Sequence, residues 1–125
     1  IVSMSFGAAE GSWTASVDAA FTGAQMTYLA ATGDSGAAVS WPSVSSNVVA
    51  VGGTTLTYTG TGTRTETSWS GTGGGVSQYT PTPSYQTSAV PGMGTLARRA
   101  VAGSPATAGS RPRRVQRSSA SGRIL

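Results

Sequence analysis

The feature that most limits what this chain can fold into is the point at which its aromatic residues stop. All nine aromatic side chains occur at or before Tyr85, and the last acidic residue is Glu66. Residues 98–125 contain seven arginines and no acid, whereas residues 1–97 have a net charge of −3. A segment with dense like charge and no aromatic residue buries too little apolar surface to offset its ordering entropy. We therefore predict a partial domain over 1–97 and a disordered, Arg-rich tail over 98–125.

The missing residue types exclude several chemistries. Without histidine, neither a Ser-His-Asp nor a Cys-His pair can form inside this chain. Without cysteine, there is neither a disulfide framework nor a thiolate metal site. No apolar run approaches the roughly 18 residues that cross a bilayer, so no membrane contact is expected. Ala, Gly, Ser and Thr fill 73 of the 125 positions, a composition that favours a secreted protein.

Apolar patterning in the first half of the chain predicts an α/β fold. Residues 1–5 alternate apolar and small polar side chains, which is typical of a strand. Ser12 is the expected N-cap of a helix that ends near residue 24. A second strand over 26–31 completes a strand-helix-strand unit, whose two strands run parallel with a right-handed crossover. Because the chain opens inside a strand, we expect it to be an internal fragment.

The next segment predicts a third strand, a hairpin and a long loop. Residues 47–51 form a short apolar run that ends in Gly52 and Gly53. Residues 54–59 and 65–69 are expected to pair as a hairpin around the Gly-Thr-Gly of 60–62. The glycines of 71–75 and the prolines that follow at 81 and 83 indicate a long loop.

Two glycine-containing turns are predicted at one edge of the parallel sheet. The first strand ends in Ser5, Phe6 and Gly7, and the second is followed by Gly-Asp-Ser-Gly at 33–36. Ligands of open parallel sheets bind beyond the carboxyl ends of the strands, so both segments are expected to face one cleft. The alternative is that Asp34 only caps its own turn, as Asx residues often do. A chymotrypsin-like interpretation of Gly-Asp-Ser-Gly fails, because its general base is a histidine.

The order of segments is more specific than any one of them. It resembles the sedolisin family of serine-carboxyl peptidases over roughly residues 1–101, through six blocks in family order. They are Val-Ser-Met-Ser-Phe-Gly at 2–7 with Glu10, Leu-Ala-Ala-Thr-Gly-Asp-Ser-Gly at 29–36, Trp-Pro to Gly-Gly-Thr at 41–54, Glu-Thr-Ser-Trp-Ser at 66–70, Gly-Gly-Gly-Val-Ser at 73–77 and Pro-Ser-Tyr-Gln at 83–86. The resemblance implies a subtilisin-like α/β fold, with a mostly parallel sheet and flanking helices.

The resemblance also implies roles for individual residues. Asp34 matches the family's oxyanion-hole aspartate, which donates a hydrogen bond only when protonated and so works in acid. Ser5, Phe6, Gly7 and Gly33 would bind the substrate, an extended peptide or protein segment, by backbone pairing. Ser35 is not the family nucleophile. Glu10 matches a recurrent family glutamate, for which a plain surface carboxylate is the alternative interpretation.

The departures from the family pattern bear on activity. The family's Gly-Thr-Ser nucleophile motif does not occur in 87–125, and no glutamate-aspartate pair has the spacing of its catalytic dyad. The calcium-binding loop of the family also lies beyond the resemblance, so no cofactor or metal is expected in this chain. We therefore expect a fragment of a secreted, acid-active endopeptidase that is inactive alone. A non-catalytic secreted interaction module and a subtilisin-like protease fragment are the alternatives; in subtilisins an asparagine replaces Asp34.

The tail departs from the family after Val101. The family commonly continues with Pro-Asp-Val, whereas here Arg, Ser, Pro, Ala and Gly dominate, as in GC-rich DNA read out of frame. We hypothesise a frameshift near residue 101, with a natural Arg-rich extension as the alternative. Its Arg-Pro-Arg-Arg sequence carries no recognition motif, so no specific nucleic-acid partner is expected.

Overall fold

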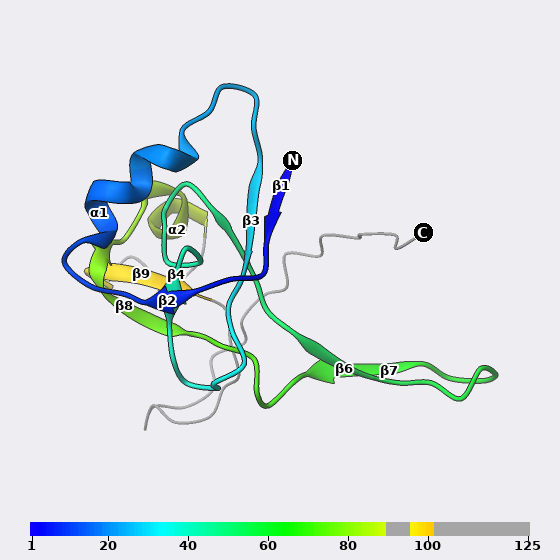
Figure 1. The fold of residues 1–125 in the computed structure, drawn as a ribbon. Helices are drawn as coiled ribbons and strands as arrows, with labels where there is room; N and C mark the ends of the chain where they lie inside the picture. Colours follow the sequence, from blue (N-terminus) through cyan, green and yellow to red (C-terminus); the bar gives the residue numbers. More distant parts are fainter. Residues whose placement is uncertain (90–95, 102–125) are drawn as a thin grey trace.

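Figure 1 shows the fold of the chain in a computed structural model, which describes residues 1–89 and 96–101. A three-stranded parallel sheet has the order β1-β3-β5, formed by Val2–Met4, Tyr28–Ala31 and Val49–Val51. Three antiparallel pairs complete the strands: β2 (Ala8–Ala9) with β4 (Ser40–Trp41), β6 (Thr54–Thr57) with β7 (Thr65–Ser68), and β8 (Gly75–Pro81) with β9 (Arg98–Val101). The helices are α1 (Thr14–Val17), a 3-10 turn over Asp18–Phe21, and α2 (Ser84–Ala89).

The prediction of a mostly parallel α/β sheet with flanking helices, subtilisin-like in form, is wrong. A parallel sheet is confirmed only for β1, β3 and β5, and the other described strands form small antiparallel sheets with few helices around them. The main cause is β8, which occupies residues that we predicted as a loop. The glycine and proline residues that we took as loop signals lie at the two ends of this strand. Gly75 begins it with a φ of 149°, which only glycine adopts readily, and Pro81 ends it.

The first helix is shorter than its apolar spacing predicts. It begins after Trp13 rather than after Ser12, no side chain caps it, and it tightens into the 3-10 turn after one turn. Two hydroxyls bond backward to carbonyls of this segment: Thr14 Oγ1 donates to Gly11 O at 2.7 Å and Ser16 Oγ donates to Trp13 O at 2.6 Å. Such side-chain bonds offer the backbone an alternative to the helix, which helps to explain the short element.

The core lies on one face of the parallel sheet. Met4, Phe21, Ala30 and Val48 are buried there, and Val2, Tyr28 and Trp41 pack against them. On the opposite face, Val49 and Val51 remain 52% and 48% exposed. Parallel sheets are usually covered on both faces. This small sheet differs, because within the described part of the chain only one of its faces is covered.

The C-terminal part of the described chain returns to the body. Arg98–Val101 pair with β8 as β9, with Val76 opposite Ala100 and Pro81 opposite Arg98. Residues 98–101, the first four of the segment that we predicted as a tail, are therefore a strand in the structure. The remaining residues of that prediction, 102–125, lie outside the described residues. No described helix has the length and apolar character to cross a membrane.

Candidate functional site

The two predicted turns follow neighbouring strands at the same edge of the sheet. Strands β1 and β3 pair in parallel, with Val2 opposite Tyr28 and Met4 opposite Ala30, so residues 5–7 and 33–36 leave the sheet at one end. Ser40 lies between them: a Cβ on Gly7 would be 3.4 Å from Ser40 Oγ, and one on Gly33 would be 3.8 Å away. The two segments therefore flank one side chain.

The turn at 33–36 is held by the glycine-rich segment that precedes β8. Gly73 N donates to Gly33 O at 2.7 Å, and Gly36 N donates to Gly71 O at 3.0 Å. Behind them, the hydroxyls of Thr32 and Thr72 share a hydrogen bond of 3.2 Å between two side chains that are each 2% exposed. The first part of the predicted loop is thus a buried support for the turn.

Asp34 is exposed at the top of this supported turn. The positive φ angles of Gly33 (95°) and Gly36 (63°) form the bend on either side of it. The turn-capping interpretation requires a hydrogen bond from the backbone to the Asp34 carboxylate, and no described residue makes one. Ser35, beside it, is also exposed. The arrangement leaves the Asp34 carboxyl available to a group in solution.

Residues 5–7 continue a strand edge that is open. Val2 N donates to Thr27 O at 2.8 Å, so the backbone groups of Val2 and Met4 point toward β3. Because strand backbone groups alternate in direction, those of Ser3 and Ser5 point the other way, toward the unpaired side of β1. No backbone hydrogen bond joins residues 5–7 to another described residue. This edge can accept an extended peptide.

Phe6 lies beside that edge with 59% of its surface exposed. Its ring centroid is 6.3 Å from that of Trp41, which also contacts Trp13 at 5.4 Å and Phe21 at 5.6 Å. The side chain of Phe6 therefore forms the outer end of an aromatic cluster that reaches into the core.

Glu10 has a structural role that sequence reasoning missed. It accepts hydrogen bonds from Ser77 Oγ at 2.6 Å and from Gln78 N at 2.8 Å, so it fastens the connection before α1 to β8. Ser77 is 2% exposed, and its Oγ also accepts from the amides of Tyr79 and Thr80. A hydroxyl that is buried and bonded three times is not positioned to attack a substrate.

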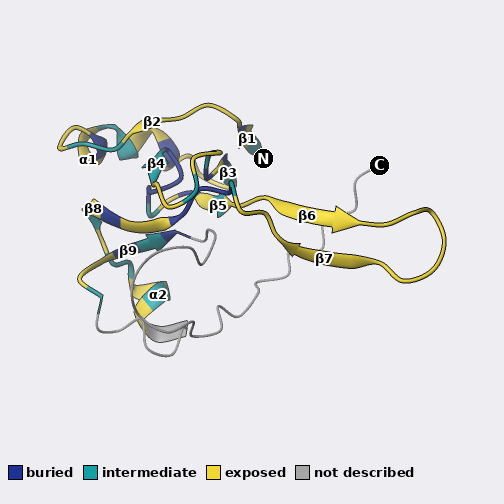
Figure 2. Cartoon of the chain, turned by 90° about the horizontal axis from the view of Figure 1, so that it is seen from below, coloured by how far each residue is buried: buried dark blue, intermediate teal, exposed yellow. Residues whose placement is uncertain are grey.

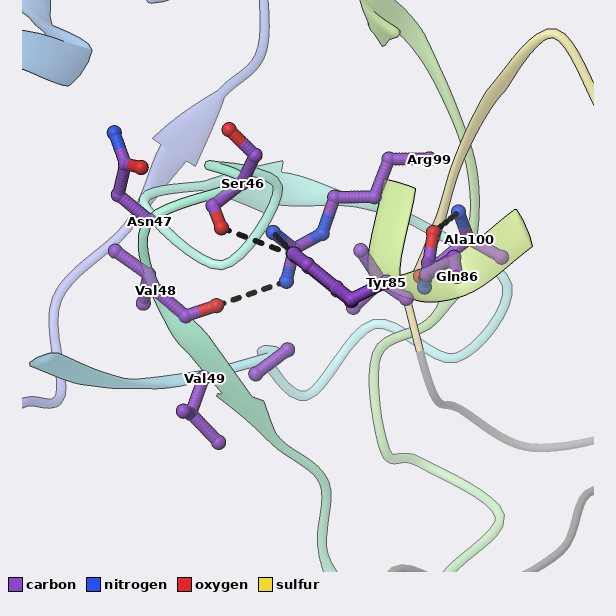
Figure 3. Close-up of a pocket in the computed structure, with 10 residues that line it drawn as sticks. Ser46, Asn47, Val48, Val49, Tyr85, Gln86, Arg99 and Ala100 are labelled. Carbon is purple, nitrogen blue, oxygen red and sulfur yellow. Dashed lines mark hydrogen bonds between the residues drawn. The ribbon is translucent and has the colours of Figure 1, made fainter. Parts of the chain in front are cut away.

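Arg99 was also missed, because we assigned it to the tail. It is 4% exposed and lines a cavity of about 350 Å³ between β5, α2 and β9 (Figure 3). Its guanidinium donates to Val48 O at 2.9 Å, to Tyr85 Oη at 2.8 Å and to Ser45 O. Burial lowers the pKa of Arg99, while nearby Tyr85 and Asp18 act in the opposite direction. The side chain fastens β9 to the turn that precedes β5.

The described residues contain no cluster of three or more His, Cys, Asp or Glu side chains that could hold a metal ion. Asp34, Ser35 and residues 5–7 are all exposed. No protein-family model matches this sequence, and a comparison with curated proteins finds no similar one.

Proposed function

We propose that this chain provides the substrate-binding edge and the oxyanion donor of a secreted serine-carboxyl endopeptidase. The observation that carries the proposal is the parallel pairing of β1 with β3. Because of it, residues 5–7 and the 33–36 turn leave the sheet at the same end, with Gly7 and Gly33 both next to Ser40. The six sequence blocks that resemble the sedolisin family support the same assignment. The substrate is a peptide or protein segment in an extended conformation.

The open edge of β1 is the part that aligns the substrate. Ser5 presents its backbone amide and carbonyl away from β3, and an added strand would hydrogen-bond to both. Gly7 continues this edge without a side chain. Binding of this kind reads the peptide backbone rather than its sequence, so it tolerates many side chains.

Asp34 is assigned to the oxyanion. A tetrahedral intermediate carries negative charge on its oxygen, and a carboxyl group stabilises that charge only as a protonated donor. The role therefore requires the protonated form of Asp34, and the exposed position of Asp34, above a turn held by backbone hydrogen bonds, lets a substrate reach it. Neither the family's Gly-Thr-Ser nucleophile motif nor its glutamate-aspartate dyad occurs in this sequence, so the chain alone is expected to bind peptides without cleaving them.

Peptide affinity tests the assignment of the edge. Ser5→Pro removes the amide that points away from β3, whereas Ser5→Ala keeps it. We expect Ser5→Pro to weaken binding of a fluorescent six-residue peptide at least about tenfold, since a bound peptide loses a backbone hydrogen bond and meets the proline ring. The Ser5→Ala variant is expected to bind like the unaltered chain.

Fluorescence anisotropy at about pH 5 measures these affinities, and circular dichroism verifies that both variants keep their fold. Equal affinities for the two variants would show that the peptide does not pair with this edge. Hydrolysis of the peptide by the isolated chain would contradict the assignment of the nucleophile to another segment.

A further inference from the structure

The hairpin of β6 and β7 stands apart from the other described elements (Figure 1). It projects away from the body as a two-stranded arm (Figures 1 and 2), and every residue of both strands is exposed. An isolated two-stranded hairpin is marginally stable in water, and three or more strands are normally needed. Within the described residues each of its strands has one unpaired edge, so the arm is open to a further strand.

The direction of the backbone groups along β7 follows from one hydrogen bond at its base. Trp69 N donates to Gly53 O at 3.1 Å, and these two residues are opposite each other in the hairpin register. Bonded and non-bonded pairs alternate in antiparallel sheets. Thr67 and Thr65 therefore bond to β6, while the amides and carbonyls of Ser68, Glu66 and Arg64 point away from β6.

The charges on that edge are self-complementary. Arg64 and Glu66 are two residues apart, and Arg64 Nη2 lies 3.3 Å from Glu66 Oε2 on the same face of the arm. If a second, antiparallel copy of β7 were placed against this edge with a two-fold axis at Thr65, Arg64 would be opposite Glu66 of the second copy, and the reverse. The backbone amides and carbonyls of both residues point away from β6, so Arg64 of one copy and Glu66 of the other would exchange backbone hydrogen bonds.

We propose that a second copy of this chain docks on the free edge of β7, giving a two-fold dimer with a four-stranded sheet β6-β7-β7-β6. Opposite charges across neighbouring strands stabilise such a pair, whereas like charges destabilise it. A two-fold axis at Glu66 or at Arg64 would place like charges directly opposite each other. With an axis between two residues, a residue whose backbone groups point to the second copy would be opposite one whose backbone groups point to β6, and the two could not exchange hydrogen bonds. The axis at Thr65 is the arrangement that satisfies charges and backbone together.

The dimer is a weak one. A pair of strands of this length buries well under the 1,200 Å² or so that marks stable interfaces, so we expect a dissociation constant of about 100 μM. Its main consequence is to convert two marginal arms into one sheet of four strands.

Sedimentation equilibrium of the full chain between about 10 μM and 1 mM, at low salt, tests the proposal. The unaltered chain is expected to dimerise. Arg64→Glu and Glu66→Arg each place like charges across the two-fold axis, so each variant alone is expected to associate at least about fivefold more weakly. An equimolar mixture of the two variants is expected to recover the dimer, because one chain then carries two negative charges and the other two positive ones.

The double variant Arg64→Glu/Glu66→Arg is expected to dimerise like the unaltered chain. Arg98→Glu, which makes the same change of charge on β9, serves as the control and is expected to leave association unchanged. A chain that stays monomeric at 1 mM would overturn the proposal. So would single variants that dimerise as well as the unaltered chain, a mixture that fails to recover the dimer, or open-ended oligomers in place of a dimer.

Discussion

Replacing Gly73 with alanine is expected to prevent the body of the molecule from folding. A Cβ at this position would lie 1.8 Å from Thr32 O, well below any real contact. Thr32 cannot move aside, because its amide donates to Val51 O and its hydroxyl is bonded to Thr72. We expect a loss of more than about 3 kcal/mol in unfolding free energy, which is a large fraction of the stability of a small domain.

Gly60→Ala is the matched control for Gly73→Ala. Gly60 also has a positive φ, 93°, but an added Cβ would have no neighbour within 4 Å. Its cost is therefore about 1 kcal/mol of backbone strain. Thermal unfolding followed by circular dichroism measures both variants. If Gly73→Ala unfolds at the same temperature as Gly60→Ala, the close packing of the glycine-rich segment on Thr32 is incorrect.

Arg99→Met is expected to have the second largest effect. The methionine fills part of the volume but leaves the carbonyl of Val48 without its donor, while Ser45 O keeps only its hydrogen bond from Val48 N and Tyr85 Oη loses its bond from the guanidinium. An unpaired buried polar group costs about 1–3 kcal/mol and each further lost hydrogen bond about 1 kcal/mol, so we expect a total loss of about 2–4 kcal/mol.

Arg98→Met provides the comparison, because Arg98 precedes Arg99 on the same strand but is exposed. We expect it to change the unfolding free energy by no more than about 0.5 kcal/mol. Urea titrations measure the unfolding free energies of the two variants. Equal stabilities would mean that Arg99 is a surface residue and that the Arg-rich segment starts where composition places it.

The sequence was a good guide to the strands of the parallel sheet. The alternation in residues 1–5 and the apolar runs at 26–31 and 47–51 predict β1, β3 and β5, because burial of one sheet face requires such patterns. The hairpin of β6 and β7 was also predicted, from the glycines at its tip. The apolar pattern of each strand and the glycines of the hairpin tip are visible within the element itself, so these elements can be predicted before their pairing partners are known.

The elements that sequence reasoning missed depend on distant partners. Strand β8 contains glycine and proline and is stable only because β9 pairs with it from about 20 residues away. In the sequence Arg99 is one of seven arginines in its segment, and nothing distinguishes it there. Its role comes from the carbonyls in the turn before β5, which only the fold brings next to it. Glu10 likewise gains its role from Ser77, 67 residues away. Composition predicts none of these three contacts.

The same distinction applies to the candidate site. The positions of Ser5 to Gly7 and of the 33–36 turn follow from parallel pairing, which the strand-helix-strand pattern predicts. The support of that turn by Gly71 and Gly73 does not, since glycine-rich segments are normally assigned to loops. Asp34 was selected by resemblance, and its exposed, unbonded carboxyl within the described structure is compatible with that selection.

The most direct test of the central claim is a nuclear magnetic resonance titration of the ¹⁵N-labelled chain with an extended peptide at about pH 5. The claim is that residues 5–7 and 33–36 form one peptide site. The expected result is that the amide resonances of Ser5, Gly7, Asp34 and Ser35 shift together and fit a single dissociation constant. Shifts confined to other parts of the molecule, with these four amides unmoved at saturation, would contradict the assignment.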